Sequence, residues 1–336
     1  MPPRRRRPTL RDIAAETGLS SAAVSYALRG LQVPVETQQR VREAADRLGY
    51  QVDPVARALA SGRTGYVGVV CRSLEDLWQQ GLAAALGRGL LEAGRSGLIV
   101  DASNDAALEA TLVQRLVDQR VDALIALPVD PRAGHWAEVA QRTVLVSIGD
   151  GLPGAATAAE VVFDNAGGVT DALSRLATAG HQRVTVLTPV AAATPDRPAE
   201  GVVLQVAADL GITATLHSAP YDLDGAGAVA RDVLAGTAPP TAFLCLADSI
   251  AYGVYAAARE LGLTVPADVS VLGFDDLAVS RLLTPPLSTY RWPVDELVTA
   301  VVARTVRAVD DDKRSRRKVL TATPQMRGSL AGPRRR

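Results

Sequence analysis

After Gly65, short apolar runs rich in Val, Leu and Ile alternate with longer Ala-rich stretches whose apolar residues recur at helical spacing. Runs of four to eight apolar residues are typical of buried strands, and the longer stretches are typical of helices. We expect eight strands, over residues 66–70, 97–102, 123–128, 143–148, 160–164, 183–188, 242–247 and 270–275. The expected helices cover residues 76–94, 104–119, 166–179, 197–210, 225–235, 248–261 and 293–309. Strands that alternate with helices predict an α/β fold with parallel sheets.

This pattern breaks near Asp164–Asn165, which divides the body into two α/β halves. We therefore predict two doubly wound parallel-sheet lobes within residues 66–330, with the chain crossing between them near 164–165 and 288–293. Folds of this kind bind ligands at the C-terminal ends of their strands. A ligand cleft between the lobes follows from the pattern.

The first 50 residues have a different, all-helical pattern. Thr9 opens a capping pattern, apolar residues follow at helical spacing, and Gly18 is a natural helix stop. Ser20 is a good N-cap for a second helix over about residues 21–29, and a third helix follows. Three short helices with a Gly-containing tight turn between the first two are typical of a helix-turn-helix. We predict such an α-helical domain over residues 1–50.

The second helix lies in the stretch LSSAAVSYALRG, which carries hydroxyls and alanines but only one charge. Helical spacing places one set of side chains opposite the inward-facing Val24 and Leu28, namely Ala22, Ser25, Tyr26 and Arg29. Small side chains let a helix backbone approach base edges in the major groove, and hydroxyls can donate to or accept from bases and phosphates. We predict that this face binds DNA. The alternative is an Ala-rich helix packed in a three-helix core.

Charge is balanced overall, with 36 basic and 36 acidic residues, but it is unevenly placed. Residues 1–65 hold eleven Lys and Arg against six acids, a net charge of +5, and the remainder carries −5. A basic head on an acidic body indicates a polyanion partner for the head. A merely solvated surface is the alternative that charge alone leaves open.

Several other classes of protein are disfavoured. No apolar run reaches the roughly 20 residues of a transmembrane helix, and no apolar signal core follows the basic N-terminus, so we expect a cytoplasmic protein without a membrane partner. Cys71 and Cys245 sit in apolar strand-like runs and are expected to be buried thiols. The three histidines show no metal-ligand spacing, so neither a metal nor a cofactor is predicted. No nucleophile–base pair, P-loop or GxGxxG motif points to an enzyme.

Residues 51–65 read as a linker. The segment 53–60 has Pro54 at its first turn and is compatible with one short helix. Eight residues do not form a stable helix alone, so this helix is expected to form when something docks against it.

Three head segments, TLRDIAAETGLSSAAVSYALRG, VETQQRVREAADRLGY and VARALASGRTGYVGVV, resemble the LacI/GalR (lac-repressor) family of bacterial transcriptional regulators. The resemblance continues through EVVFDNAGG, LADSIAYGVYAAARELGLTVPADVSVLGFDD and LLTPPLSTYRWPVDEL, and so covers nearly the whole chain. It implies a helix-turn-helix head, a hinge helix and a two-lobe periplasmic-binding-protein-like core that binds an effector and forms a homodimer.

The resemblance implies specific DNA contacts. Base-reading positions correspond to Ser21, Ala22 and Tyr26, and phosphate-contacting positions to Thr9, Ser20 and Ser25. The tyrosine is a departure, since the family often has arginine or another long polar residue there, and a different base preference is expected. Leu59, with Ala56 one turn earlier, matches the hinge leucine that enters the minor groove, where an apolar wedge kinks the duplex. An ordinary linker leucine packed on the core is the alternative. Paired hinges imply a dimer on near-palindromic double-stranded DNA.

The cleft shows more departures from the family pattern. Strand-end and loop residues expected to face the effector are Arg72, Ser73, Trp78, Ser147, Asp164, Arg197, Asp248 and Asp275. Asp275 keeps the family aspartate, whereas Ala247 and Ser147 replace polar residues, and Arg197 is out of register. We expect a small-molecule effector, a sugar or another metabolite, but not a standard monosaccharide fit. Trp78 has the alternative of packing beneath the first helix of the core.

The C-terminal stretch VDDDKRSRRKV is expected to be a charged loop, and residues 331–336 a disordered basic tail. The sequence shows no heptad-repeat tail of the kind that would favour a tetramer. The leading prediction is a dimeric DNA-binding repressor controlled by an effector. Two alternatives stay open: a regulator whose cleft has lost its effector, and a transport-type solute-binding protein, which the basic head and absent signal disfavour.

Overall fold

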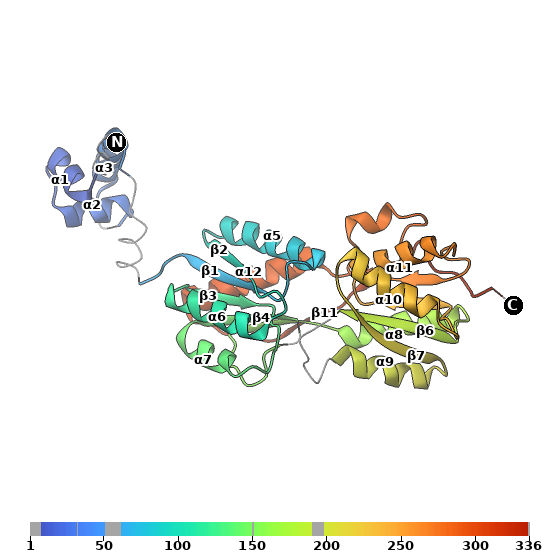
Figure 1. Cartoon of the computed structure of the whole chain (residues 1–336). Coiled ribbons are helices and arrows are strands. Elements are labelled where there is room, and N and C mark those ends of the chain that lie inside the picture. The colour runs from blue at the N-terminus through green and yellow to red at the C-terminus, as the bar shows by residue number, and fades with distance from the viewer. Residues whose placement is uncertain (1–7, 32, 51–61, 150, 190–197, 335–336) are drawn as a thin grey trace. The chain divides into compact units, whose positions relative to one another are not determined.

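The computed structural model describes residues 8–31, 33–50, 62–149, 151–189 and 198–334 (Figure 1). The chain divides into two compact units, Met1–Thr64 and Gly65–Arg336. The first unit is a small helical head and the second is a two-lobe α/β core. The predicted hinge helix, with Ala56 and Leu59, lies outside the described residues, as does Arg197.

The head contains α1 (Leu10–Thr17), α2 (Ser21–Leu28) and α3 (Val35–Leu48). A capping box forms at Thr9, whose backbone N–H donates to the Asp12 carboxylate at 2.7 Å. Gly18 ends α1 with φ of +69°, a conformation that glycine adopts without strain. The Ser20 hydroxyl caps α2 by accepting a 3.2 Å hydrogen bond from Ala23 N–H. These local signals confirm the predicted helix starts, although α2 ends one residue before Arg29.

The head core is small and fully apolar. Its buried side chains come from all three helices, as Ile13, Val24, Ala27, Val41 and Ala44. Leu28 and Leu48 pack against this cluster while staying half-buried. The inward face of α2 is therefore the predicted one.

The first lobe has a six-stranded parallel sheet in the order β11-β5-β4-β3-β1-β2. Its strands are β1 (Tyr66–Cys71), β2 (Ser96–Asp101), β3 (Ala123–Ala126), β4 (Val144–Gly149), β5 (Ala159–Phe163) and β11 (Lys318–Leu320). Helices α5 (Leu77–Glu92) and α12 (Val294–Asp311) cover one face, and α6 (Ala106–Asp118) and α7 (His135–Arg142) cover the other. Consecutive residues such as Val69 and Val70 face opposite layers, so both faces are apolar.

The second lobe has a four-stranded parallel sheet in the order β7-β6-β8-β9. Its strands are β6 (Arg183–Pro189), β7 (Thr213–Ala219), β8 (Ala242–Cys245) and β9 (Ser270–Leu272). Helices α8 (Asn165–Thr178) and α9 (Pro198–Asp209) pack on one face, and α10 (Leu223–Leu234) and α11 (Asp248–Glu260) on the other. At the α10–α11 contact a Cβ on Gly253 would lie 2.5 Å from the Ala226 Cβ, so only glycine permits this approach.

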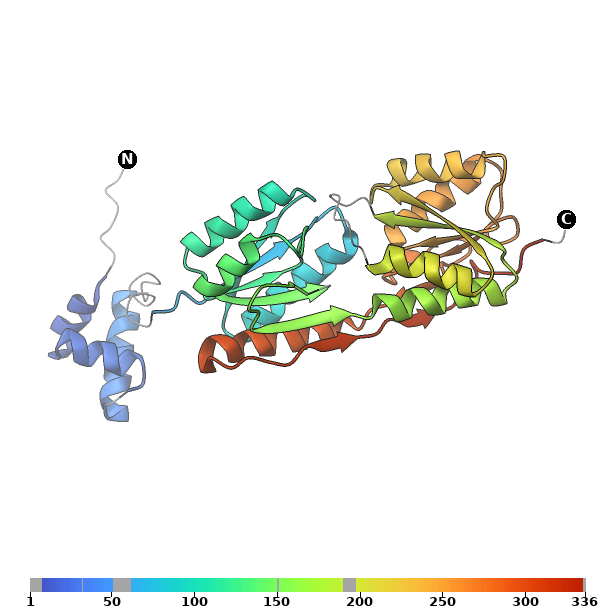
Figure 2. The ribbon, with the colours of Figure 1, turned by 90° about the horizontal axis from the view of Figure 1, so that it is seen from below.

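The chain crosses between the lobes three times. β5 leads into α8, β10 (Thr289–Arg291) leads into α12, and β11 leads into β12 (Thr323–Gln325), which pairs antiparallel with β10. In Figure 2 the red C-terminal segment runs from the first lobe to the second. The backbone N–H of Asp164 donates to Leu320 O at 2.8 Å, which ties two crossings together. The first two crossings lie at 163–165 and 291–294, and the third was not anticipated.

Other expectations need correction. All eight predicted strands are present, but α7, β7, β10, β11 and β12 are additional. The charged stretch after residue 309 is partly regular, because α12 continues to Asp311 and β11 begins at Lys318. Residues 331–334 are not a disordered tail, since Ala331 O accepts hydrogen bonds from Ser270 Oγ and lies 2.8 Å from His181 Nε2, and Arg334 pairs with Asp268. Among the described helices, none combines the length and apolar composition that crossing a membrane requires.

Candidate functional site

The outward face of α2 is the first candidate site. Ser21, Ala22, Tyr26 and Arg29 are exposed and Ser25 is half-buried, whereas Val24 and Ala27 are buried in the head core. Small residues near the helix start leave its backbone open to approach. The face is therefore free to contact a partner without disturbing the core.

Tyr26 and Arg29 form a unit on this face. The Arg29 guanidinium carbon lies 5.3 Å from the Tyr26 ring centroid, and Arg29 Nε donates to Ser25 O at 3.2 Å. A cation over an aromatic face is favourable by about 0.5–1 kcal/mol at exposed sites. The pair presents a phenolic hydroxyl and a guanidinium side by side, which suits base edges and phosphates respectively.

The capping hydroxyls differ in how free they are. Thr9 Oγ1 already donates to Asp12 Oδ2 at 2.8 Å, so it can offer a further ligand only its lone pairs. Ser20 Oγ accepts from a backbone N–H and keeps its own proton, so it can donate to a phosphate oxygen.

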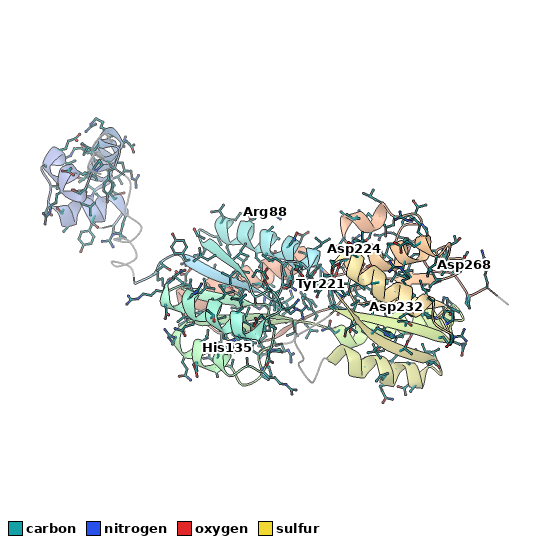
Figure 3. The ribbon with its side chains drawn as sticks, in the orientation of Figure 1. Arg88, His135, Tyr221, Asp224, Asp232 and Asp268 are labelled. Carbon is teal, nitrogen blue, oxygen red and sulfur yellow. The ribbon has the colours of Figure 1, made fainter. Side chains whose placement is uncertain are left out.

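The second candidate site is a cavity of about 190 Å³ in the core, lined from both lobes. Tyr221 lies where the two lobes meet (Figure 3). The lining side chains are Arg72, Asp76, Trp78, Gln79, Leu127, Pro128, Ile148, Gly149, Phe163, Asn165, Val169, Pro189, Tyr221, Leu246, Ala247, Phe274, Asp275 and Trp292. The lining follows the C-terminal ends of several strands, as the fold predicts.

Aromatic side chains dominate this cavity. The chain has only three Trp and three Phe, and two of each line it. Phe163 lies 4.5 Å from Trp292 and 5.6 Å from Trp78 between ring centroids. Trp78 packs against the cores of both lobes and also lines the cavity, so the two interpretations of this residue are compatible. Its buried Nε1 has no acceptor among the described residues, which leaves a donor for a ligand.

Polar and ionisable groups line the cavity from both lobes. The Arg72 guanidinium, from the first lobe, donates to Tyr221 Oη of the second at 3.4 Å. Asp76 is buried at the start of α5, where it accepts from Trp78 N–H at 2.9 Å. Asp275 is half-buried with φ of +113°. Burial, reinforced by the charges of Asp76 and Asp248, raises the pKa of Asp275 well above its ordinary value. The cavity thus offers both donors and acceptors beside aromatic rings.

Other residues expected in the cleft do not line it. Ser147 is buried within β4, and its hydroxyl has no partner among the described residues. Asp164 caps α8 by accepting from Gly167 N–H at 2.9 Å. Ser73 is buried and accepts from Glu75 N–H. The side chains of parallel-strand ends alternate in direction, so a strand-end position alone does not decide which of them reaches the cavity.

Asp248 was expected to face the effector, but its carboxylate is fully buried. It accepts hydrogen bonds from Leu277 N–H at 2.9 Å, Ser280 Oγ at 2.5 Å and Thr289 Oγ1 at 2.6 Å. Burial raises its pKa to about 7, against the lowering effect of these three bonds. Asp248 therefore links the segment 277–289 to α11 by hydrogen bonds. It lies next to Asp275 but does not line the cavity.

Sequence reasoning missed several lining residues, including Phe163, Tyr221, Phe274 and Trp292, and from the loop 75–78 it singled out Trp78 but not Asp76. A signal was present for two of them, since both phenylalanines directly follow apolar strand runs in a chain with few aromatics. Asp76 lies two residues before Trp78 in the same loop, whereas Trp292 gave no signal because it reaches the cavity from a segment far along the sequence.

The described residues contain no cluster of three or more His, Cys, Asp or Glu side chains that could hold a metal ion. Cys71 and Cys245 are free and buried, as expected. Burial raises the pKa of the Cys71 thiol to about 12, which makes it a poor nucleophile or metal ligand.

Comparison with known proteins places this geometry in context. A family model of a periplasmic binding protein-like domain matches residues 173–330. The chain is 33% identical over 306 residues to the HTH-type transcriptional regulator MalR of Streptomyces coelicolor, covering 87% of this chain and 88% of that protein. The lac repressor dimer bound to operator and an anti-inducer superposes with a TM-score of 0.85 at 23% identity, over 97% of this chain and 100% of that one. A LacI family regulator from Arthrobacter in complex with lactose gives a TM-score of 0.68 at 23% identity, over 79% and 98%.

Proposed function

Because the chain belongs to the LacI/GalR family of DNA-binding transcriptional regulators, we propose that it is a repressor that binds a near-palindromic operator as a homodimer and responds to a small polyhydroxylated effector in the interlobe cavity. The observation that carries the proposal is the exposed face of α2, with Ser21, Ala22 and Tyr26 outward on a separately folded head. Such a face fits the major groove, where hydroxyl and guanidinium groups reach base edges and phosphates.

Base reading is assigned to Ser21, Ala22 and Tyr26, and phosphate contacts to Thr9, Ser20, Ser25 and Arg29. Tyr26 supplies one hydroxyl and an apolar ring, which suits contact with a thymine methyl beside a hydrogen-bond partner. Leu59 and Ala56 are assigned to the minor groove at the operator centre, where a deformable base step lowers the cost of kinking.

Solvent-exposed apolar side chains on the surface of the two-lobe unit support homodimer formation. Leu282 is 81% exposed, Leu91 70% and Leu223 54%. Burial of such side chains against a second copy would gain about 25 cal/mol per Å². The similarity to the lac repressor dimer on its operator supports the same arrangement.

The effector is proposed to be a sugar or sugar-like molecule. Aromatic faces at Trp78, Phe163 and Trp292 suit the apolar face of a sugar ring, and the Trp78 N–H, Arg72 and Asp275 supply partners for its hydroxyls. A volume of about 190 Å³ lies below the roughly 300–1,000 Å³ of drug-sized pockets, so a small ligand is favoured. The similar regulator solved with lactose supports this class.

Coupling between the two sites is proposed to run through the lobes. Arg72 and Tyr221 join the lobes across the cavity, so a ligand that replaces their contact favours one lobe arrangement over another. An effector acts only through its differential affinity for the two arrangements, typically 1–3 kcal/mol.

The test is selection of the purified full-length protein against random duplex DNA, followed by sequencing of the bound molecules. A palindrome is expected for the wild type, and Tyr26→Phe should change the preference at one base pair of each half-site. Tyr66→Phe, which alters a tyrosine of the core that is also 40% exposed, should select the wild-type site. The absence of any enriched site, with and without cell metabolites, would refute the proposal.

The selected operator then allows a screen of sugars for release of the protein. An effector-independent regulator is the second candidate, since Ser147 leaves a buried hydroxyl without a described partner where the family has an aspartate. Release by a sugar that Trp78→Ala weakens at least tenfold would favour the effector-controlled form. Operator binding that no metabolite changes would favour the second candidate.

A further inference from the structure

The loop between α12 and β11 carries an unusual concentration of positive charge. Residues 313–318 read KRSRRK, with five basic side chains in six positions and no acidic one. We call residues 313–317 the basic loop. Lys313, Arg314, Arg316 and Arg317 are all exposed. Neither the helix-turn-helix face nor the interlobe cavity uses this segment.

The basic loop lies where the strands of the first-lobe sheet begin, which is also where the chain enters the core. We call this end of the sheet its N-terminal edge. All strands of this sheet are parallel, so their N-terminal ends meet at one edge. Gly65 lies at this edge, since its carbonyl accepts from Ser96 N–H at 2.8 Å at the start of β2. The loop is held at the same edge by Ser315 N–H, which donates to Ala158 O at 2.8 Å. Four strand spacings of about 4.8 Å separate β11 from β1, a lateral distance of roughly 20 Å.

The loop retains charge that the core does not neutralise. Lys313 lies 3.6 Å from Asp311, and Arg317 lies 3.8 Å from Glu160, both loose ion pairs. Arg314 and Arg316 form no ion pair with any other described residue. Exposed arginines without partners contribute little to folding, and their charge stays available to an external anion.

A groove beside the loop offers room for such an anion. Its volume is about 280 Å³, and Arg142, Thr143, Lys313 and Arg314 line it at the same edge of the sheet. One carboxylate, that of Asp312, also lines the groove and would repel a bound anion. Arg142 pairs with Asp118 at 3.1 Å and Lys313 lies 3.6 Å from Asp311, so Arg314 is the lining cation without an ion pair among the described residues.

We propose that the basic loop binds the phosphate backbone of the DNA held by the head, as a second, sequence-independent contact. The inference rests on the proposed operator binding. DNA bound by the head is tethered to Gly65 through residues 51–64, whose reach is at most about 50 Å. The partner is thus a polyanion kept near this edge by the chain itself. Arginine suits it, since the guanidinium pairs with phosphate oxygens in a bidentate manner.

The test compares full-length wild type with the double variant Arg314→Gln/Arg316→Gln. Each phosphate contact contributes about −0.9 to the slope of log K against log salt concentration. Removal of two contacts per chain should make the slope shallower by roughly 2 per chain. Affinity should fall by a similar factor on the selected operator and on random duplex, because backbone contacts carry no sequence information.

Two controls separate the local contact from overall charge. Arg183→Gln/Arg259→Gln removes the same charge from exposed positions in the second lobe and should leave the slope unchanged. Asp312→Asn should have the opposite effect and tighten binding, and its φ of +54° suits Asn as well as Asp.

The location can be mapped directly with a DNA-cleaving iron chelate attached to Arg316→Cys. Selective labelling is feasible because the native cysteines are buried. Cleavage of operator DNA from position 316, with none from Arg259→Cys, would support the proposal. Unchanged slope and affinity in the double variant, with wild-type operator selection intact, would overturn this inference alone. Failure of the wild type to select any DNA would overturn both it and the proposed function.

Discussion

Substitution of Asp248 tests how much its buried hydrogen bonds stabilise the core around the cavity. The side chain is fully buried and accepts three hydrogen bonds that join α11 to the segment 277–289. Asp248→Ala removes the acceptor and leaves three donors facing a small void. Asp248→Asn keeps the shape, with its amide oxygen toward Leu277 N–H and its NH₂ toward the Thr289 hydroxyl, which can turn to accept.

The expected loss of stability follows from the number of hydrogen-bond donors that lose Asp248 as their acceptor. A net hydrogen bond contributes about 1 kcal/mol, and an abandoned buried donor costs about 1–3 kcal/mol. The Ser280 hydroxyl retains Tyr252 Oη at 2.8 Å as a partner, so Leu277 N–H and Thr289 Oγ1 carry most of the loss. We expect Asp248→Ala to lower the unfolding free energy of the core by about 3 kcal/mol at pH 5. For a unit of this size the midpoint temperature should fall by roughly 6–12 °C.

The pH dependence has a defined sign. The pKa of Asp248 is raised to about 7 in the folded protein because the group is buried, and it is close to 4 when the chain is unfolded. Between these values the folded state binds a proton that the unfolded state lacks, so stability falls as pH rises from about 4 to 7. The loss from this group is up to about 4 kcal/mol. Asp248→Asn, which cannot ionise, should therefore be slightly less stable than wild type at pH 5 and more stable at pH 8.

The assay is urea unfolding at pH 5 and pH 8, followed by tryptophan fluorescence. All three tryptophans belong to the core, so the signal reports on that unit alone. Glu109, whose pKa burial also raises to about 7, adds its own pH dependence to every variant. Asp275 contributes as well, because its raised pKa depends partly on the charge of Asp248, so the comparison is between variants at each pH. Equal loss in Asp248→Asn and Asp248→Ala, or an unchanged pH slope in Asp248→Asn, would refute the reasoning.

Three further predictions are independent of this cluster. Ser20→Ala should destabilise the head by about 1 kcal/mol through loss of the α2 cap, seen as faster amide exchange in α2; unchanged protection would contradict the cap. Gly253→Ala should cost about 1–3 kcal/mol in thermal unfolding because the new Cβ meets Ala226, while Gly81→Ala, with open space in α5, should gain a few tenths to 1 kcal/mol; matching effects would disprove the close approach. Leu59→Ala should weaken operator binding more than random-duplex binding in a titration, and equal losses would remove the wedge assignment.

Features encoded by neighbouring residues were predictable from the sequence. The head is the clearest example, since Thr9, Gly18 and Ser20 act on backbone groups within four residues of themselves. The outward face of α2 followed from helical periodicity alone. The alternation of apolar runs predicted two parallel-sheet lobes for the same reason, because burial on both faces demands continuous apolar strands.

Features that depend on distant segments were not predictable in this way. The third crossing, the order of β11 beside β5 and the antiparallel β10–β12 pair involve strands of three residues, too short to leave a pattern. The docking of residues 331–334 onto the second lobe depends on Ser270 and His181, far upstream in the sequence.

The cavity shows the same division at the level of single residues. The sequence by itself determined that a cleft lies at the strand ends and that Arg72, Trp78 and Asp275 are near it. Only the tertiary structure decided that Tyr221 and Trp292 join them, and that Asp248 is buried and does not line the cavity. The physical reason is that a periodic pattern records which face of an element is buried, whereas the neighbours across that face are chosen by how separate elements pack.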